Sequence, residues 1–549
     1  MLEYTGDGPD TPDSGRPAPQ YVRGKPRILT TAMKQRLIAV FPFLYPPMFA
    51  MDPVLTLYAS NVSEVSPSEV FMPLVAALGL ALTLLLLARV LIRDIRKAAL
   101  IATLFLVLFF FYGPILSIIR GWAAPGVLQP TPWIILIIVW VIILISGIYL
   151  IIRTHRNLAG LTTVLTVVGL LLVMISSINI AVNETNISSQ DIRPADSLTL
   201  SEPELSIAGT MPDIYYIILD RYAGASTLQE VYDFDNSEFL NFLTDRGFYI
   251  AHESRANYLK TRSSLASSLN MGYINYLTEE LGEGFTDVGP IYDMLQDYDV
   301  WHLLKSMGYE FVHSGSWWGP TRSNEYADIN LNYSQIPYFP MILFENTMAY
   351  PLCVTSHIFD DRHTRHSKCA LYSYENLADI PNIANPTFVF AHLLMPHPPY
   401  VFDTDGSCLT IDEAQQRSAA TNYVNQLVFT NSKLQLLIDE LLSKSDIPPV
   451  IILQADEGPF PPGTDSPDFK WEITNEALLK QKMRILNAYY LPDVDDDVLY
   501  SSITPVNSFR VVFNSYFGTD LALLPDTSYV IHGGHPYKFL DITDVVDYE

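Results

Sequence analysis

The stretch VIILQADEGP, residues 450–459, decides the fold of the second half of the chain. Residues 450–454 predict a short strand buried on both faces, and the chain must turn at Gly458 and Pro459. Asp456 and Glu457 stand between the strand and the turn. Burying an unpaired carboxylate costs several kcal/mol, so this pair requires a cationic side chain, water or a metal ion.

Four further runs have the same character, and amphipathic stretches alternate with them. The runs are IYYIILD (214–220), YEFVHS (309–314), TFVFAHLLMPH (387–397) and ILNAYYLP (485–492). The amphipathic stretches predict helices at residues 237–246, 291–307 and 419–443. This alternation predicts an α/β domain over residues 212–549, with a mostly parallel central sheet flanked by helices.

Ionisable side chains stand at the ends of three of the predicted strands. They are Asp220, His397, and the pair Asp456 and Glu457. Ligands of open α/β sheets bind beyond the carboxyl ends of the strands, so these residues together predict a metal site. For each aspartate alone, the alternative is a cap on the following helix. His392 lies inside its strand, where we expect a buried, hydrogen-bonded histidine.

The first third of the chain is far more apolar than the rest. Hydrophobic residues make up 49% of the 549 residues and charged residues 17%, which indicates that part of the chain lies in lipid. A helix needs about 20 apolar residues to cross a bilayer. Five runs reach that length: residues 37–58, 70–92, 98–119, 132–152 and 160–182. Prolines and Asp52 interrupt the first run, for which a re-entrant segment is the alternative.

Loop charges orient the predicted spans. Basic residues precede the first run and recur at residues 89–97 and 153–156, whereas the intervening loops are nearly neutral. By the positive-inside rule, residues 1–36 form a cytoplasmic tail and residues 37–183 a five-helix bundle in the cell membrane. A linker at 184–211 then leads to an extracytoplasmic domain. The net charge of −26 excludes nucleic acid as a partner.

The segment TRSSLASSL, residues 261–269, predicts a helix of small residues that opens on a hydroxyl group. Unpaired amide groups and the positive end of the helix dipole surround such a position, so an anion can bind against Thr261. The local sequence alone favours the simpler interpretation that Thr261 is an N-cap.

The order of these motifs resembles the alkaline phosphatase/sulfatase superfamily. The resemblance covers about residues 212–460 and includes IILD, the helix opened by Thr261, PHPPY, and the strand followed by DEG. The sulfatase nucleophile motif has Cys or Ser where this chain has Thr261, and Pro and Arg at Ser263 and Leu265. Threonine is the nucleophile in two membrane branches that this chain resembles, the lipoteichoic acid synthases and the lipid A phosphoethanolamine transferases. Both carry five transmembrane helices.

The resemblance implies a metal site at Asp220, Thr261, Asp456 and Glu457. Family members usually have His or Asn at the position of Glu457. An all-oxygen ligand set favours one Mn²⁺ or Mg²⁺ ion over Zn²⁺.

The resemblance also assigns roles outside the metal site. It implies that His397 binds the substrate or protonates the leaving group, and that Trp318 and Arg322 hold the phosphate.

These features favour a membrane-anchored phosphotransferase. It would move phosphoglycerol or phosphoethanolamine from a phospholipid to an envelope glycan or lipid, through a phosphothreonine at Thr261. A hydrolase on the same site (a phosphodiesterase, phosphatase or sulfatase) is one alternative. A catalytically inactive envelope binding protein is the other, and the unusual Glu457 is its main support.

Overall fold

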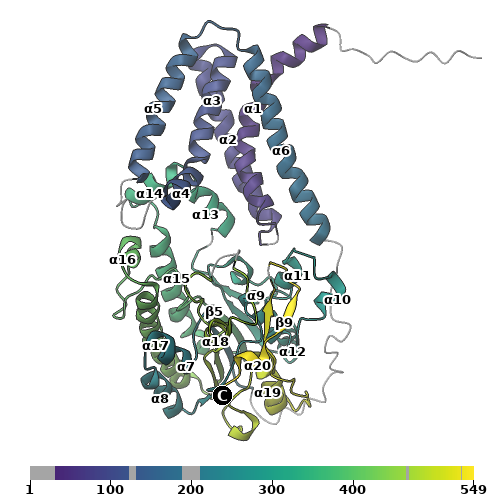
Figure 1. Cartoon of the computed structure of the whole chain (residues 1–549), viewed down its shortest axis with the longest axis vertical. Coiled ribbons are helices and arrows are strands. Elements are labelled where there is room, and N and C mark those ends of the chain that lie inside the picture. The colour runs from purple at the N-terminus through teal and green to yellow at the C-terminus, as the bar shows by residue number, and fades with distance from the viewer. Residues whose placement is uncertain are drawn as a thin grey trace, which may run out of the picture.

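The computed structural model describes residues 31–62, 64–122, 132–187, 211–334, 336–464, 469–532 and 534–548. A layer of long helices stands on an α/β domain (Figure 1). Most of the predicted N-terminal tail and nearly all of the predicted linker lie outside the described residues. The long helices are α1 (Thr31–Ala59), α2 (Pro67–Ile92), α3 (Ile95–Phe110), α4 (Tyr112–Trp122), α5 (Pro132–Arg153) and α6 (Ala159–Ile187).

Local capping explains how the basic turn between α2 and α3 forms. Arg93 adopts a left-handed conformation and ends α2, with its amide bonded to the Arg89 carbonyl. Asp94 caps α3 by accepting hydrogen bonds from the amides of Arg96 and Lys97. The basic residues that orient the predicted bundle therefore lie at a tight helix–helix connection.

Three of the described helices are long and apolar enough to cross a membrane, namely Pro67–Ile92, Pro132–Arg153 and Ala159–Val182. The pair Ile95–Phe110 and Tyr112–Ile119 makes a fourth if it is taken as one span, but it is bent by 45°. Helix α1 is continuous although it contains four prolines. The membrane region is thus helical, and the count of five spans stays a prediction.

The α/β domain is built on a mixed seven-stranded sheet of order β2-β7-β6-β1-β5-β3-β4. Strands β6, β1, β5, β3 and β4 pair in parallel, whereas β7 runs antiparallel to β6 and β2. A separate pair joins β8 and β9. The strands are β1 (Ile214–Leu219), β2 (Tyr249–Ile250), β3 (Glu310–Ser314), β4 (Ile329–Leu331), β5 (Thr387–Leu393), β6 (Val450–Gln454), β7 (Asn487–Tyr490), β8 (Tyr529–Ile531) and β9 (Phe539–Asp541).

The central strands are buried on both faces, as their continuous apolar sequences predict. Alternate residues of β1 enter two hydrophobic cores, Tyr215 and Ile217 on one face and Tyr216 and Ile218 on the other. The first face is covered by α7 (Ala225–Tyr232), α8 (Ser237–Asp245), α15 (Arg362–Leu377), α17 (Ala419–Lys444) and α18 (Glu476–Met483). The second is covered by α9 (Thr261–Leu269), α11 (Gly289–Asp293), α12 (Asp299–Ser306) and α19 (Pro505–Phe517).

The predicted helices at 237–246 and 419–443 correspond to α8 and α17. The predicted helix at 291–307 is instead two short helices, α11 and α12. Tyr298 adopts an extended conformation between them, its ring is buried, and the Asp299 amide donates to the Asn270 side chain at 3.3 Å. A tertiary hydrogen bond therefore starts α12 where the sequence pattern would continue one helix.

Two short helices, α13 (Tyr338–Glu345) and α14 (Ala349–Thr355), lie between the membrane helices and the α/β domain (Figure 1). Phe339 packs edge-on against Tyr58 of α1, and the Met348 amide donates to the Phe109 carbonyl at 2.9 Å.

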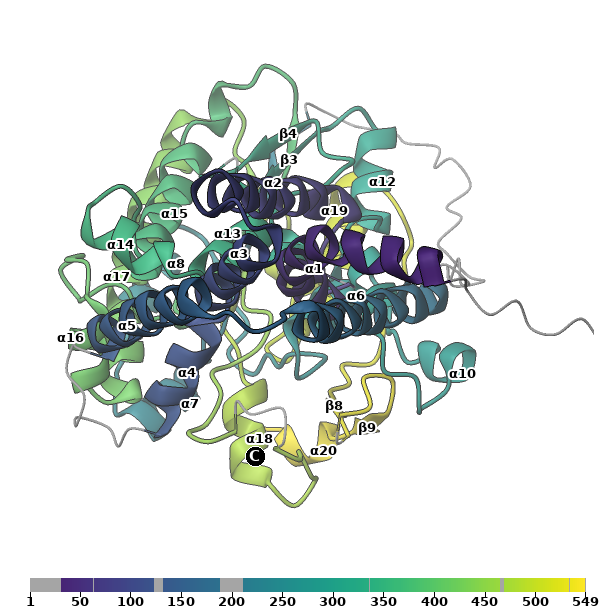
Figure 2. The same ribbon diagram turned by 90° about the horizontal axis from the view of Figure 1, so that it is seen from above.

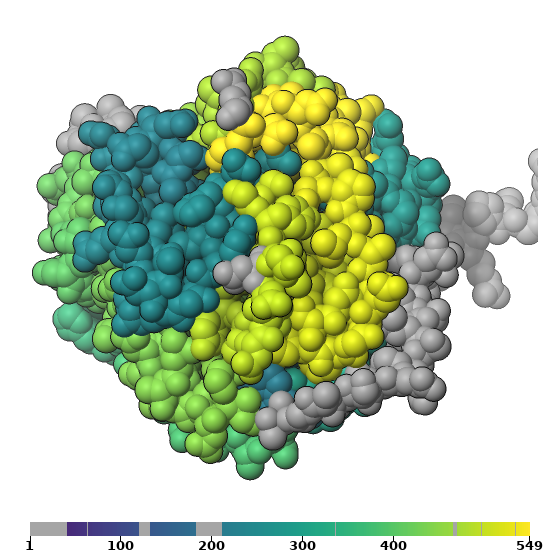
Figure 3. Space-filling model, turned by 90° about the horizontal axis from the view of Figure 1, so that it is seen from below, coloured from purple at the N-terminus to yellow at the C-terminus, as the bar shows by residue number. Residues whose placement is uncertain are grey.

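Seen from above, the membrane helices cross over the α/β domain (Figure 2). The opposite face is formed largely by the teal segments after residue 220 and by the C-terminal segments (Figure 3). The remaining α-helices are α10 (Leu277–Leu281), α16 (Ile411–Gln416) and α20 (Thr543–Val546).

Candidate active site

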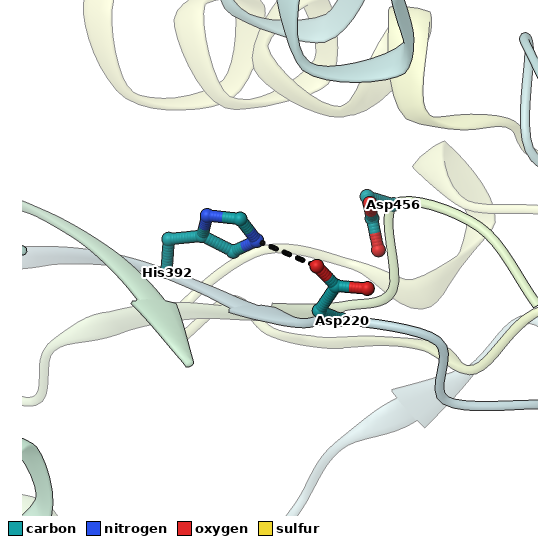
Figure 4. Close-up of side chains that lie close together, drawn as sticks. All are labelled: Asp220, His392 and Asp456. Atoms are coloured by element: carbon teal, nitrogen blue, oxygen red, sulfur yellow. Dashed lines mark ion pairs between the residues drawn. The ribbon is translucent and has the colours of Figure 1, made fainter. Parts of the chain in front are cut away.

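Strand register brings the first candidate ligands together. Ile218 of β1 lies opposite both His392 of β5 and Gln454 of β6, so Asp220 is level with Asp456 at the carboxyl edge of the sheet. Single ligand atoms of Asp220, His392 and Asp456 all lie within 4.8 Å of one another, and the three residues are buried (Figure 4). The Nε2 atom of His392 is 3.3 Å from Oδ2 of Asp220.

His392 is buried and hydrogen-bonded, as its position inside a strand predicts. Its Nδ1 atom is 2.8 Å from the Thr321 hydroxyl, which in turn lies 2.9 Å from the Ser316 hydroxyl. Burial lowers the pKa of His392 to about 4, against the opposing effect of Asp456 and Glu457. The ring is therefore neutral at physiological pH and presents Nε2 to the carboxylates, the form in which histidine binds a metal ion.

Thr261 is the first residue of α9 and follows the N-cap residue Lys260, so it is not itself the N-cap. Its hydroxyl lies beside the Asp456 carboxylate and lowers the pKa of that group, against the larger, opposing effect of burial. The Ser264 hydroxyl donates to the Asp456 carbonyl at 2.7 Å, which fixes the start of α9 against the end of β6. The structure thus places Thr261 near Asp220 and Asp456 at the carboxyl edge of the sheet.

The two buried aspartates create a demand for a cation. Burial raises the pKa of Asp456, and the nearby carboxylates of Asp220 and Glu457 raise it further. Within the described part of the chain, Oδ2 of Asp456 is buried and has no hydrogen-bond partner. Two carboxylate groups and an imidazole nitrogen in this arrangement fit a divalent metal ion.

Glu457 is held by a different partner. Its Oε1 atom lies 2.6 Å from Nζ of Lys482 and 3.5 Å from Nε of Arg221. Glu457 is therefore outside the group of Asp220, His392 and Asp456. The all-oxygen ligand set on which the choice of Mn²⁺ or Mg²⁺ rests is not the set that the structure gathers, because His392 takes part and Lys482 neutralises Glu457.

Lys482, at the end of α18, was not foreseen from the sequence. Its fully buried ammonium group also donates to the Gly458 carbonyl at 2.7 Å and lies 3.5 Å from the centre of the Phe460 ring. Burial lowers the pKa of Lys482, and Glu457 opposes that effect. A Cβ atom at Gly458 would lie 2.9 Å from the Lys482 carbonyl, so the DEG turn requires glycine for this close approach.

A cavity of about 180 Å³ opens over Thr261. Asp220, Thr261 and Glu457 are part of its wall. The remaining lining consists of cations, aromatic rings, His397 and one leucine: Arg221, Lys260, Arg262, Tyr292, Trp317, Trp318, Leu394, His397 and Phe460. A cavity with several cationic side chains beside a hydroxyl at a helix N-terminus suits a phosphate group.

Two of the three predicted substrate-binding residues lie in this cavity, namely Trp318 and His397. The third, Arg322, does not. Its guanidinium group donates to the carbonyls of Ser334 (2.8 Å) and Ile336, beside a separate cavity that Glu69 also lines. The loop after β3 thus directs Arg322 toward the membrane helices.

Other arginines and a lysine take the place expected for Arg322. Arg221 directly follows Asp220, and Lys260 and Arg262 flank Thr261. The triplet Lys260-Thr261-Arg262 was a usable signal in the sequence, since both neighbours of a helix N-terminal hydroxyl are basic. Lys482 had no such signal, because it lies on a distant helix.

His397 is partly exposed at the cavity wall, where its ring contacts Trp317 edge-on at 5.8 Å. Its Nδ1 atom contacts the Pro398 carbonyl. Burial, and then the positive charge of Arg221, lower the pKa of His397 well below its usual value. A neutral ring at this position binds substrate by hydrogen bonds and is a poor acid for the leaving group.

The membrane region touches the cavity wall directly. The Tyr292 hydroxyl donates to Glu64, in the loop between α1 and α2, at 3.0 Å. Tyr292 packs edge-on against Trp318 at 5.8 Å, and Trp318 packs edge-on against His392 at 6.0 Å. A line of contacts therefore runs from the membrane loop to the candidate metal centre.

Among solved structures, the chain is similar to the C-terminal periplasmic domain of EcEptC from Escherichia coli (TM-score 0.39, 13% identity, covering 61% of this chain and 93% of that one). A Zn complex of that domain matches with the same TM-score and 12% identity, covering 61% and 93%. The integral membrane lipooligosaccharide phosphoethanolamine transferase A of Neisseria meningitidis matches over 86% of this chain and 94% of its own, with TM-score 0.36 and 12% identity. No family model and no curated protein matches the chain.

Proposed function

We propose that the protein is a membrane-anchored phosphotransferase. It moves a phospho-head group, phosphoglycerol or phosphoethanolamine, from a phospholipid to an envelope glycan or lipid. The observation that carries this proposal is the position of the Thr261 hydroxyl, beside Asp456 and in the wall of a cation-lined cavity. The membrane loop that contacts Tyr292 supports a substrate that is itself a lipid, with the catalytic domain outside the cell membrane.

Asp220, His392 and Asp456 would hold the divalent ion of the proposed enzyme, with Thr261 beside them. Two carboxylates with one imidazole suit Zn²⁺ as well as Mn²⁺, and suit Mg²⁺ less well. When bound, such an ion lowers the pKa of a threonine hydroxyl and offsets the charge of an incoming phosphate. Glu457 contributes by pairing with Lys482 behind the turn and with Arg221 at the cavity wall.

The residues of the chain support a two-step transfer. In the first step Thr261 loses its hydroxyl proton and its oxygen bonds to the phosphorus of the lipid, while the bond from phosphorus to the glyceride oxygen breaks. That oxygen takes up a proton, and diacylglycerol leaves. In the second step an acceptor hydroxyl loses its proton and attacks the same phosphorus, and Thr261 leaves and regains a proton. Arg221, Lys260 and Arg262 face the phosphate oxygens in both steps.

Mass spectrometry of Thr261 tests this function. Full-length protein is incubated with phospholipid vesicles and Zn²⁺ or Mn²⁺, quenched in acid, digested and mapped. We expect a phospho-head group on the peptide that carries Thr261, and none in a Thr261→Ala variant or after chelation. A chain that releases free head group with no trapped adduct and no acceptor product is a hydrolase. A chain that neither binds a divalent ion nor alters the lipid refutes the proposal.

A further inference from the structure

The chemistry of an ammonium head group sets clear requirements on a binding site. An ammonium ion donates three hydrogen bonds and accepts none, so it needs carboxylate or carbonyl oxygens around it. The face of an aromatic ring adds a further favourable contact. An enzyme that selects phosphoethanolamine must offer such a group of acceptors beside the phosphate.

Among the residues that the structure describes, the candidate active site contains one group of this kind, and the ammonium group of Lys482 binds to it. The Glu457 carboxylate, the Gly458 carbonyl and the Phe460 ring surround the ammonium group of Lys482, at 2.6, 2.7 and 3.5 Å. Glu457 and Phe460 line the cavity, and Lys482 lies behind them with its side chain fully buried. To bind here, a substrate ammonium group would have to displace the ammonium group of Lys482, which is part of the protein chain.

The rest of the cavity disfavours a second ammonium ion. In the described part of the chain, the carboxylates that line it belong to Asp220 and Glu457. Asp220 belongs to the candidate metal centre, and Lys482 pairs with Oε1 of Glu457 and balances its charge. Arg221 and Lys260 each lie 4.4 Å from the centre of the Phe460 ring, so that ring already contacts three cations. Like charges held in one partly dehydrated cavity repel each other strongly.

We infer that the transferred head group carries no ammonium group and is a hydroxylated one of the glycerol phosphate kind. This inference rests on the proposed function and narrows it to one of the two head groups. Arg221, Lys260 and Arg262 bind the phosphate, and hydroxyl groups of the head group find hydrogen-bond partners in His397 and the tyrosine and tryptophan side chains of the wall. Lys482 acts as a positioning and specificity-determining residue, since it occupies the acceptors that ethanolamine would use.

The test compares vesicles of phosphatidylglycerol with vesicles of phosphatidylethanolamine in the Thr261 adduct experiment, using full-length protein. We expect the phosphoglycerol adduct to form at least about tenfold faster. Preferential formation of the phosphoethanolamine adduct would overturn the inference and leave the proposed function standing. Absence of both adducts, with divalent ion bound, would overturn the proposed function and the inference with it.

Variants at Lys482 sharpen the test. Lys482→Met leaves Glu457 without its cation, so we expect the preference for phosphatidylglycerol to shrink by about tenfold or more. The double variant Glu457→Gln with Lys482→Met removes the carboxylate as well and should not accept phosphatidylethanolamine. Lys480→Met changes a lysine on the same helix that pairs with Glu476, and serves as the matched control. An unchanged preference in folded Lys482→Met would contradict the specificity role.

Ligand-induced shifts of the unfolding temperature test the inference when a variant has too little activity for rate measurements. Glycerol 3-phosphate should raise the unfolding temperature of the wild-type protein more than phosphoethanolamine does, and Lys482→Met should narrow that difference. If phosphoethanolamine gives the larger shift with the wild-type protein, the inference is wrong, whatever the rates show.

Discussion

Replacing Glu457 by glutamine tests the buried ion pair that holds the DEG turn. At a distance of 2.6 Å the two charges attract by about 6 kcal/mol, for an effective dielectric constant of about 20. The side chains are 2% and 0% exposed, so loss of the carboxylate leaves a buried ammonium ion with a carbonyl and a ring as its remaining contacts. We expect Glu457→Gln to lower the free energy of unfolding by about 3 to 5 kcal/mol.

Thermal unfolding of the full-length protein in detergent, followed by tryptophan fluorescence, measures this effect. At roughly 2 °C per kcal/mol for a large domain, the midpoint should fall by about 6 to 10 °C. Lys482→Met alone should cause a similar loss, because it leaves Glu457 buried without its cation. The double variant should recover much of the stability, since an uncharged pair of similar volume has no unpaired charge.

The double-variant cycle shows whether Glu457 and Lys482 stabilise the fold as a pair. If the stability lost by the double variant equals the sum of the losses of the two single variants, Glu457 and Lys482 are not coupled. The turn would then owe its stability to other contacts, and the assignment of Glu457 to Lys482 would fail. The measurements are made with chelator and again with Zn²⁺, so that any contribution of Glu457 to metal binding is seen separately.

Three further outcomes follow from the same geometry. Thr261→Ala should slow transfer by at least about a thousandfold, while Thr261→Ser keeps measurable activity, as rates of head-group transfer will show. Asp456→Asn should stabilise the metal-free protein by about 1 to 2 kcal/mol, because it removes one of two adjacent buried carboxylates, and calorimetry should detect no high-affinity divalent ion. His366 is a buried residue of α15, outside the candidate metal centre. Burial lowers its pKa from 6.5 to about 3, so below pH 6.5 the unfolded chain gains a proton that the folded protein does not. The free energy of unfolding should therefore fall by about 2 kcal/mol from pH 7 to pH 5 because of His366. Unfolding curves of His366→Gln should not show this contribution.

The class of fold was predictable because its determinants are local. The apolar runs at 214–220, 309–314, 387–397, 450–456 and 485–492 each contain a strand of the sheet. Asp220 and Asp456 could be paired in advance because parallel strands end at one edge, and register places them level. The placement of Thr261 beside Asp456 followed from the order of the motifs together with the resemblance they carry.

Other features of the candidate site depend on contacts between residues far apart in the sequence, which local patterns do not predict. Arg322 and Arg262 have the same side chain, yet the loop after β3 sends one to backbone carbonyls near residue 334 and α9 places the other in the cavity. His392 is five residues from His397 in the chain, but strand alternation and burial bring His392 to the carboxylates.

Local sequence patterns predict an apolar helical region followed by an α/β domain with acids at its strand ends, because hydrophobic periodicity and the residues at strand ends are local features. The tertiary structure alone decided the partner of each acid. Asp456 meets Asp220 and His392, whereas its neighbour Glu457 meets Lys482, twenty-five residues later and on another helix. A buried charge pairs with an opposite charge that the fold brings within hydrogen-bond distance. The spacing of two residues along the chain does not predict that distance.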